Sequence, residues 1–340
     1  MASRTGPAWP VRAAAIVKAH GLAKAANGVV DALVAGVTAA CVLLVTDDPA
    51  GRYSDCALDT LALIGGLKLP YHRVAAAQLY PALLAAAESE SRQLPVAVVA
   101  DVDELHQPVP GGLPAVGRRL ELPSRRYQRD VWQHVLCPVL APYQHATLEA
   151  RLSGAGRHMP PQPRPALPDV PDALPPKWQA VARQYVPLFD AFKEVRGKDS
   201  LVCGDTGVAT FFAFPPYHCV DICTYMGGSL PLAIGALLAG CREAWAVSGD
   251  FAFIAAGQLG LLEAVLRRLP LKVLIMHNGR AEATGGQPIP AGSFEAALAG
   301  YQRYVLHIAH PQERGEAAAV LEQARREPGL RIVVAEYERA

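Results

Sequence analysis

The sequence lacks the features that mark several classes of protein. Among its 340 residues, 32 Lys and Arg are balanced by 31 Asp and Glu, so the net charge of +1 gives no electrostatic case for binding nucleic acid or an anionic membrane. No apolar run is long enough to span a bilayer, and residues 1–15 lack the apolar core of a signal peptide. We therefore expect no nucleic-acid or membrane partner and a cytoplasmic location.

The seven cysteines do not form a recognisable framework. Their odd number and irregular spacing argue against a disulfide scaffold. Cys219 and Cys223 are separated by three residues, but no second pair completes a metal site. The closely spaced cysteine runs that hold iron–sulfur clusters are also absent. We expect structural thiols and no such cluster in this chain.

What the sequence does contain is an alternation of strand-like and helix-like segments, which predicts an α/β fold with helices on both faces of parallel sheets. In the first region we expect strands at residues 39–49 and 94–104, with an Ala-rich helix at 75–89. In the last region we expect strands at 200–205, 244–250, 271–278 and 331–337, and helices at 228–240, 255–269, 293–303 and 314–327.

A proline-rich stretch lies between these two α/β regions. Residues 159–178 read MPPQPRPALPDVPDALPPKW, which cannot form a helix or a central strand and is typical of a semi-rigid spacer. A helix is expected directly after it, at 178–195. We predict a first unit at residues 1–110, a linker region at 111–190 that contains the proline-rich segment, and a second unit at 191–340.

Two strands of the second unit end in oxygen-bearing side chains. AWAVSGD ends in Gly249 and Asp250, and LKVLIMHNG ends in Asn278 and Gly279. The parallel strands of a βαβ unit end at one sheet edge, where ligands bind. A carboxylate, an amide oxygen and a nearby backbone carbonyl suit Mg²⁺, which commonly also binds phosphates. For these two motifs taken alone, an ordinary βαβ unit with turn residues at its ends is the favoured explanation.

The segment between these strands has leucines at helical spacing. Leu259, Leu262, Leu266 and Leu269 give the expected helix one apolar face. Its N-terminus, just after Asp250, offers backbone N–H groups to phosphate.

Two further glycine-rich turns belong to the same sheet edge. CGDTG ends the strand at 200–205, and TYMGGS places Met226 before a glycine pair and a helix. Ser229 can cap that helix, and Pro231 suits its first turn. Three such turns predict a cradle for an elongated phosphorylated cofactor.

These motifs resemble the diphosphate-binding domain of thiamine diphosphate enzymes. The signature of that family is GDG followed, one helix and one strand later, by NN or NG. Here it reads GDF…HNG, with Phe251 in place of the third glycine. The resemblance is closest to indolepyruvate ferredoxin oxidoreductase α subunits. It extends over residues 200–290, through GDTGVATFFAFPPYHCVDICTYMGGS and HNGRAEATGGQPIP.

The resemblance implies roles for individual residues. Asp250, Asn278 and the backbone carbonyl of Arg280 would hold Mg²⁺. Met226 would wedge beneath the thiazolium ring, and the carbonyl of Thr224 would contact the aminopyrimidine ring. Further cofactor contacts are expected from the three turns, at Gly204, Asp205, Thr206, Gly227, Gly249, Phe251 and Ala252.

The first region resembles the second half of the family's pyrimidine-binding domain, through VKAHGLAKAANGVVDALVAGVTAACVLLVTDDPAGRYSD at residues 17–55. His20 stands where the family has an active-site histidine, which implies a catalytic role. A surface or hydrogen-bonded histidine is the alternative.

One element of the family pattern has no counterpart. The family activates its cofactor with a Glu from the first half of the pyrimidine domain, and in this chain the similarity starts near Val11, after that position. Glu88 and Glu90 lie in a later helix and do not fit. Three explanations are open: a partner chain supplies the missing half, the reaction does not need this Glu, or the chain is a non-catalytic scaffold. We favour a partner, because a sheet that lacks strands exposes an edge.

Together these features predict a subunit of a thiamine diphosphate- and Mg²⁺-dependent enzyme that acts on a 2-oxo acid, as a dimer or heteromer. Without a cysteine cluster, either a separate subunit transfers electrons or the reaction is a non-oxidative decarboxylation or carboligation. The substrate is not readable from the sequence. Four aromatic residues either line a pocket or pack in the core: Phe211, Phe212, Phe214 and Tyr217.

Overall fold

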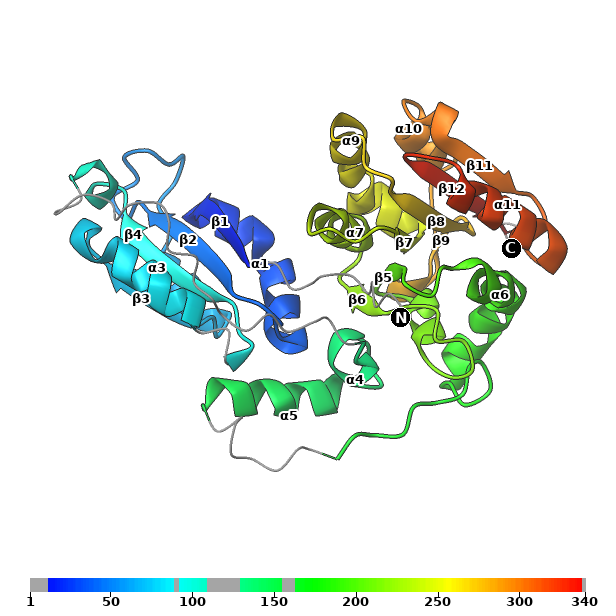
Figure 1. Cartoon of the computed structure of the whole chain (residues 1–340), viewed down its shortest axis with the longest axis horizontal. Helices are drawn as coiled ribbons and strands as arrows, with labels where there is room; N and C mark the ends of the chain where they lie inside the picture. The colour runs from blue at the N-terminus through cyan, green and yellow to red at the C-terminus, as the bar shows by residue number, and fades with distance from the viewer. Residues whose placement is uncertain (1–11, 89–91, 109–128, 155–162, 338–340) are drawn as a thin grey trace, which may run out of the picture. The chain divides into compact units, whose positions relative to one another are not determined.

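The computed structural model describes residues 12–88, 92–108, 129–154 and 163–337 (Figure 1). The chain divides into two compact units. The N-terminal unit comprises Trp9–Tyr127 and Pro142–Pro163, and the C-terminal unit comprises Met1–Ala8, Gln128–Ala141 and Arg164–Ala340. Within the described ranges no helix has the length and apolar character needed to cross a membrane. The cytoplasmic location stays a prediction.

The N-terminal unit contains a parallel sheet with the strand order β1-β2-β4-β3. Its strands are β1 (Ala13–Lys18), β2 (Cys41–Asp47), β3 (Tyr71–Val74) and β4 (Val96–Asp101), and its helices are α1 (Ala19–Ala35), α2 (Thr60–Gly66), α3 (Leu79–Glu88) and α5 (Ala141–Leu152). Successive side chains of β4 point to opposite faces of the sheet. Ala97 and Val99 pack with α1, α2 and α5 on one face, and Val96 and Val98 pack with α3 on the other. Glu90 lies outside the described residues.

Strand β1 forms an open edge of this sheet. Within the described ranges it is hydrogen-bonded to β2 alone, and five of its six residues are exposed. Ile16 on this strand is 75% exposed. An unpaired strand edge with apolar side chains is a surface on which another strand can pair.

The C-terminal unit contains a six-stranded parallel sheet with the order β11-β12-β8-β7-β5-β6. Its strands are β5 (Leu201–Asp205), β6 (Ile222–Thr224), β7 (Ala244–Gly249), β8 (Lys272–His277), β11 (Val305–Ile308) and β12 (Arg331–Glu336). A short antiparallel pair joins β9 (Arg280–Ala281) to β10 (Gln287–Pro288). The helices are α4 (Val131–His134), α6 (Pro176–Val195), α7 (Ser229–Leu238), α8 (Asp250–Ala252), α9 (Leu259–Leu266), α10 (Ser293–Leu298) and α11 (Arg314–Arg326).

Shorter helical turns connect these elements in both units. They are η1 (Ala76–Gln78), η3 (Glu104–His106), η5 (Val208–Ala213), a π-helical turn η6 (Phe253–Gly257), η7 (Glu282–Thr284) and η8 (Gln302–Tyr304).

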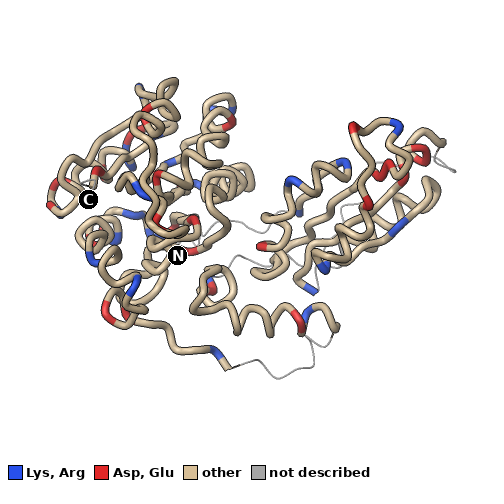
Figure 2. The backbone as a smooth tube through the Cα atoms, turned by 180° about the vertical axis from the view of Figure 1, so that it is seen from behind, with Lys and Arg blue, Asp and Glu red and all other residues tan. Residues whose placement is uncertain are grey.

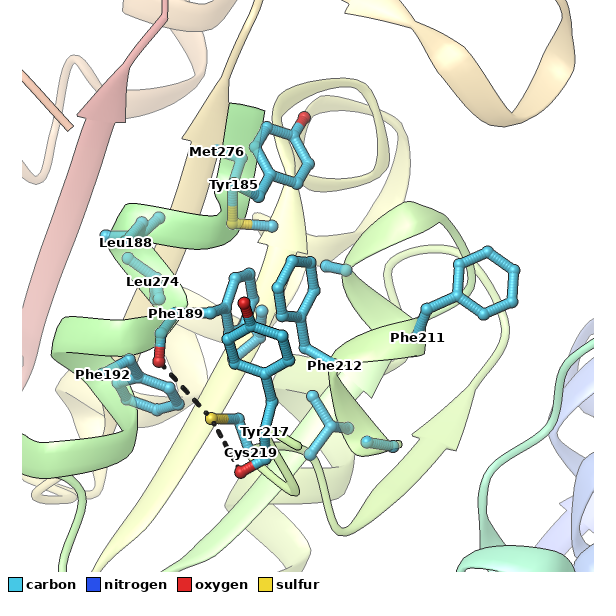
Figure 3. Packing of buried hydrophobic residues seen from close by; sticks show 14 of the residues in the cluster. Tyr185, Leu188, Phe189, Phe192, Phe211, Phe212, Tyr217, Cys219, Leu274 and Met276 are labelled. Atoms are coloured by element: carbon cyan, nitrogen blue, oxygen red, sulfur yellow. Dashed lines mark hydrogen bonds between the residues drawn. The ribbon is translucent and has the colours of Figure 1, made fainter. Parts of the chain in front are cut away.

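The largest hydrophobic core of the C-terminal unit lies between its sheet and helices α6 and α11. Figure 3 shows aromatic rings from α6 and η5 packed together, with Phe189 and Phe212 stacked at 3.8 Å between ring centroids. The four aromatic residues whose role was open are all at most 6% exposed and belong to this core: Phe211, Phe212, Phe214 and Tyr217. Packing therefore accounts for them.

The division of the chain differs from the predicted boundaries at residues 110 and 190. Helix α6, expected as a helix but assigned to the linker region, is an integral part of the C-terminal unit, because Leu188, Phe189 and Phe192 are fully buried against the sheet. An amphipathic helix packs on a sheet face regardless of the prolines before it. Residues 159–162 of the proline-rich segment lie outside the described residues.

The predicted apolar face of the helix after Asp250 lies mostly at the surface. Leu259, Leu262 and Leu266 are 74%, 56% and 69% exposed, and the buried positions of α9 are Leu261 and Ala264. Helix α9 packs on α7, where Leu230 and Ile234 lie against Gly260, so the row of leucines faces away from this contact. The leucine spacing therefore predicts the helix correctly but selects the wrong face as the buried one.

Candidate functional site

The carboxyl ends of β5, β7 and β8 surround a cavity of about 60 Å³ in the C-terminal unit. Nine of the predicted site residues line it: Asp205, Thr206, Met226, Gly249, Asp250, Phe251, Ala252, Asn278 and Arg280. Parallel pairing of the three strands brings these turns, far apart in the sequence, to one edge of the sheet. Their ligation of a cofactor or metal stays a prediction.

Asp250 connects two of these strand ends. It is 1% exposed, its Oδ2 accepts hydrogen bonds from the backbone N–H groups of Asn278 (3.0 Å) and Gly279 (2.7 Å), and its Oδ1 accepts one from Phe251 (2.7 Å). Burial raises the pKa of the Asp250 carboxyl, and these N–H donors offset part of that effect. Among the described residues no Lys or Arg forms an ion pair with it, so a bound cation would compensate the buried charge.

The side chain of Asn278 is held at both ends of its amide. Its Oδ1 accepts a hydrogen bond from the backbone N–H of Arg280 (2.9 Å), and its Nδ2 donates one to the hydroxyl of Tyr185 (3.0 Å). Gly279 follows with a φ of +70°, in the left-handed region that glycine adopts without strain. This turn directs the chain into β9 and brings Arg280 to the same cavity.

The residues present fit a magnesium ion bound together with a diphosphate. Within the described ranges no three His, Cys, Asp or Glu side chains could hold a metal ion. One carboxylate, one amide oxygen and one backbone carbonyl are instead a donor set that Mg²⁺ completes with phosphate oxygens and water. At Gly207 and Gly249 an added Cβ would meet nothing within 4 Å, so a ligand can approach the backbone of both turns closely.

Asp205 lines the cavity, but its oxygens bond within the protein. Oδ1 accepts the backbone N–H of Ser229 (2.7 Å) at the start of α7, and Oδ2 accepts the hydroxyl of Ser248. Burial raises the pKa of Asp205 to about 6 against the effect of these hydrogen bonds. Asp205 thus satisfies an N-terminal N–H group of α7, in place of the cap expected from Ser229.

Three predicted cofactor residues do not line the cavity. Gly227 has a φ of +83°, and a Cβ there would lie 2.6 Å from the Cβ of Ala256, so glycine is needed for packing against η6. A Cβ on Gly204 would lie 2.9 Å from a methyl group of Val220. Thr224 ends β6, beside Asp205 in the strand register.

His20 lies in the N-terminal unit, in the first turn of α1. Its Nε2 is 3.0 Å from the sulfur of the exposed Cys56, and its Nδ1 is buried without a hydrogen-bond partner within the described ranges. The structure thus shows a histidine paired with a thiol. The catalytic role of His20 stays a prediction.

The cavity also has lining residues that the sequence did not indicate. Tyr185 comes from α6, 93 positions before the asparagine to which it is bonded, so no local pattern could identify it. Glu282 lies just beyond the HNG motif and adds a second carboxylate to the lining. Its position shortly after that motif was the only available signal.

Residues 203–333 match the family model "Thiamine pyrophosphate enzyme, C-terminal TPP binding domain". This part of the chain is therefore similar to the cofactor-binding domain of this class of enzymes, and the predicted resemblance is confirmed.

Two curated relatives are subunits named IorA of indolepyruvate oxidoreductase. The protein from Methanothermobacter marburgensis is 34% identical over 128 residues, and that from Methanothermobacter thermautotrophicus is 29% identical over 127 residues. In both cases the alignment covers 37% of this chain and 21% of the relative. The match thus spans about a fifth of the length of these relatives.

Two solved structures share the fold at 13% sequence identity. They are a putative thiamin diphosphate-dependent enzyme from Mycobacterium smegmatis (TM-score 0.59) and the thiamine diphosphate-dependent 4-hydroxybenzoylformate decarboxylase of Rhodococcus jostii RHA1 (TM-score 0.60). Each alignment covers 96% of this chain and 88% of the other. The predicted α/β fold with parallel sheets and helices is confirmed, and the two solved structures share it.

Proposed function

We propose that this chain is a subunit of a thiamine diphosphate- and Mg²⁺-dependent enzyme that decarboxylates a 2-oxo acid, oxidatively or not. The observation that carries the proposal is the grouping of Asp250, Asn278 and Arg280 at one cavity, beside the open backbone of Gly207 and Gly249. This grouping lies within the segment that matches the family model.

When bound, thiamine diphosphate would supply an electron sink for the decarboxylation. Asp250, Asn278 and the carbonyl of Arg280 would hold Mg²⁺, and the N–H groups of the glycine-rich turns would bind the diphosphate. Met226, which is half-buried in the cavity lining, would support the thiazolium ring. His20 would transfer protons near the reacting carbon.

A partner chain would complete the enzyme. The open edge of β1 supports this part of the proposal, because an exposed strand edge gains hydrogen bonds when another strand pairs with it. The partner would contribute the activating Glu. The relatives named as subunits of an oxidoreductase also favour a heteromer, with electrons transferred by a separate subunit.

A non-oxidative decarboxylase or carboligase is the second candidate. The fold likeness to a 4-hydroxybenzoylformate decarboxylase favours it. A cofactor-binding scaffold without activity is the third. Release of CO₂ and an aldehyde from a 2-oxo acid without any electron acceptor would identify the non-oxidative enzyme, and acceptor-dependent turnover would identify the oxidative one.

The test of the proposal is calorimetric titration of the chain with thiamine diphosphate at increasing Mg²⁺. We expect saturable, Mg²⁺-dependent binding that Asp250→Ala weakens at least roughly a hundredfold, or about 2.7 kcal/mol. Asp172→Ala is the matched control, since Asp172 is an exposed carboxylate paired with Arg183. Equal affinity of the wild type and Asp250→Ala would refute the metal assignment.

A further inference from the structure

Tyr185 is a buried polar residue in the lining of the candidate site. It is 5% exposed, and its hydroxyl accepts a hydrogen bond from Nδ2 of Asn278 at 3.0 Å. Figure 3 shows its ring beside Met276, with the hydroxyl oxygen on the side away from Phe189 and Phe212. The ring therefore belongs to the core, whereas the hydroxyl meets the polar side chains at the ends of β7 and β8.

The bond from Asn278 to Tyr185 constrains which atom of the amide can meet a cation. With Nδ2 held by the Tyr185 hydroxyl and Oδ1 facing the backbone N–H of Arg280, the plane and the orientation of the amide are both set. An amide oxygen accepts two hydrogen bonds or ligands, so one lone pair of Oδ1 stays available for a metal. A rotated amide would place Nδ2 against the N–H of Arg280, donor against donor.

The surroundings of Tyr185 hold its side chain in place. The ring packs on that of Tyr337 at 4.9 Å between centroids, and the whole side chain is buried. The hydroxyl oxygen is thereby kept within hydrogen-bond distance of the Asn278 amide.

We propose that Tyr185 is a positioning residue of the metal site, which acts through Asn278 by fixing the amide so that Oδ1 is presented to the cation. This inference rests on the proposed function, since it assumes that Asn278 binds Mg²⁺. Helix α6 thereby connects the aromatic core to the metal site. Partners that orient metal ligands typically change metal affinity by about 10- to 100-fold when they are removed.

The experiment compares Tyr185→Phe with Tyr337→Phe. Both variants keep the ring and remove one buried hydroxyl from the same aromatic pair, but the Tyr337 hydroxyl has no hydrogen-bond partner within the described ranges. We expect Tyr185→Phe to weaken the Kd of Mg²⁺, titrated calorimetrically at saturating thiamine diphosphate, by about 10-fold or more. Tyr337→Phe should leave the Kd within about twofold of the wild type, and melting curves verify that both variants are folded.

A second pair of variants tests whether Tyr185 acts through Asn278. Asn278→Ser keeps an oxygen ligand but removes the amide nitrogen that bonds to Tyr185. Adding Tyr185→Phe to Asn278→Ser should then change the Mg²⁺ Kd by less than about twofold, because interacting residues are non-additive in a double-mutant cycle.

The outcomes separate this inference from the proposed function. If wild-type protein binds Mg²⁺ with thiamine diphosphate and Tyr185→Phe binds equally well, the positioning role is refuted and the proposed function stands. An equal loss from Tyr185→Phe on the wild-type and Asn278→Ser backgrounds would also refute it. Absence of Mg²⁺-dependent binding by the wild type would overturn the proposed function and this inference together.

Discussion

The polar residues at the carboxyl ends of the strands have different roles in the two units of this chain. In the C-terminal unit, Asp250 and Asn278 at the ends of β7 and β8 line one cavity. In the N-terminal unit, acidic residues also gather where β2 and β4 end (Figure 2), but they serve local structure. Asp47 is buried and accepts a hydrogen bond from Thr60 (2.6 Å), and Asp48 accepts the backbone N–H groups that follow it in its own loop. Acidic strand ends thus line a cavity in the C-terminal unit, whereas in the N-terminal unit they stabilise neighbouring loops and helices.

The units also differ in how completely their sheets are covered. The central strands of the six-stranded sheet are buried along almost their whole length. The four-stranded sheet ends in the exposed strand β1. The sheet of the C-terminal unit is therefore covered by helices of the same unit. The N-terminal unit instead has an exposed edge strand, on which a further strand can pair.

The largest effect expected from this difference concerns stability. Trp245 on β7 is fully buried, packs edge-on against Phe192 and donates its indole N–H to Glu243 (3.0 Å). We expect Trp245→Ala to lower the free energy of unfolding by about 3–5 kcal/mol. Ile16→Ala on the open edge should change it by less than about 0.5 kcal/mol. Denaturant titration of both variants measures the contrast, and comparable losses would show that β1 is not an open edge.

A smaller effect is expected from the buried carboxyl of Asp205. Its pKa of about 6 exceeds the ordinary 3.8, so the folded protein binds a proton more tightly than the unfolded chain. The contribution of Asp205 to the free energy of unfolding is therefore greatest below pH 4. It falls by about 3 kcal/mol as the pH rises through about 6.

Asp205→Asn keeps an acceptor for the N–H of Ser229 and adds a donor for the hydroxyl of Ser248. We expect this variant to be more stable than wild type at pH 7.5, with the advantage disappearing toward pH 4, as measured by unfolding across that range. The exposed Asp172 provides the control variant Asp172→Asn. Parallel wild-type and Asp205→Asn curves would contradict the raised pKa.

The open turn at Gly249 should affect binding rather than stability. Its φ is −85°, and an added Cβ meets nothing within 4 Å, so Gly249→Ala should fold normally. The new methyl group would nevertheless occupy space at the proposed diphosphate site, and we expect affinity for thiamine diphosphate to fall roughly tenfold, or about 1.4 kcal/mol. Gly235→Ala, equally open but within α7, is the control. Unchanged calorimetric affinity of Gly249→Ala would place the diphosphate elsewhere.

The smallest effect concerns the thiol of the N-terminal unit. Cys56 is the exposed cysteine and is paired with His20, whereas burial raises the pKa of Cys137, Cys219 and Cys241. We expect iodoacetamide to alkylate Cys56 first, as peptide mass spectrometry would show. Alkylation of the buried cysteines as fast as that of Cys56 would contradict this order.

The success of the sequence-based predictions followed the position of each strand in its sheet. The predicted strands β2, β4, β5, β7, β8 and β12 are all central, and their near-continuous apolar runs reflect burial on both faces. The strands that were not predicted are β1, β3, β6 and β11, the edges of the two main sheets. Edge strands are short or exposed and carry no such run.

The sequence by itself determined which residues lie at the ends of the central strands. Because parallel strands connected by helices all end at one edge of the sheet, it also determined that Asp205, Asp250 and Asn278 lie near one another. Only the tertiary structure decided how they are used. It directs the oxygens of Asp205 toward α7 and β7, brings Tyr185 to Asn278 across 93 positions, and packs α9 on α7 so that its leucines face outward. These outcomes depend on contacts between distant segments, which no local sequence pattern encodes.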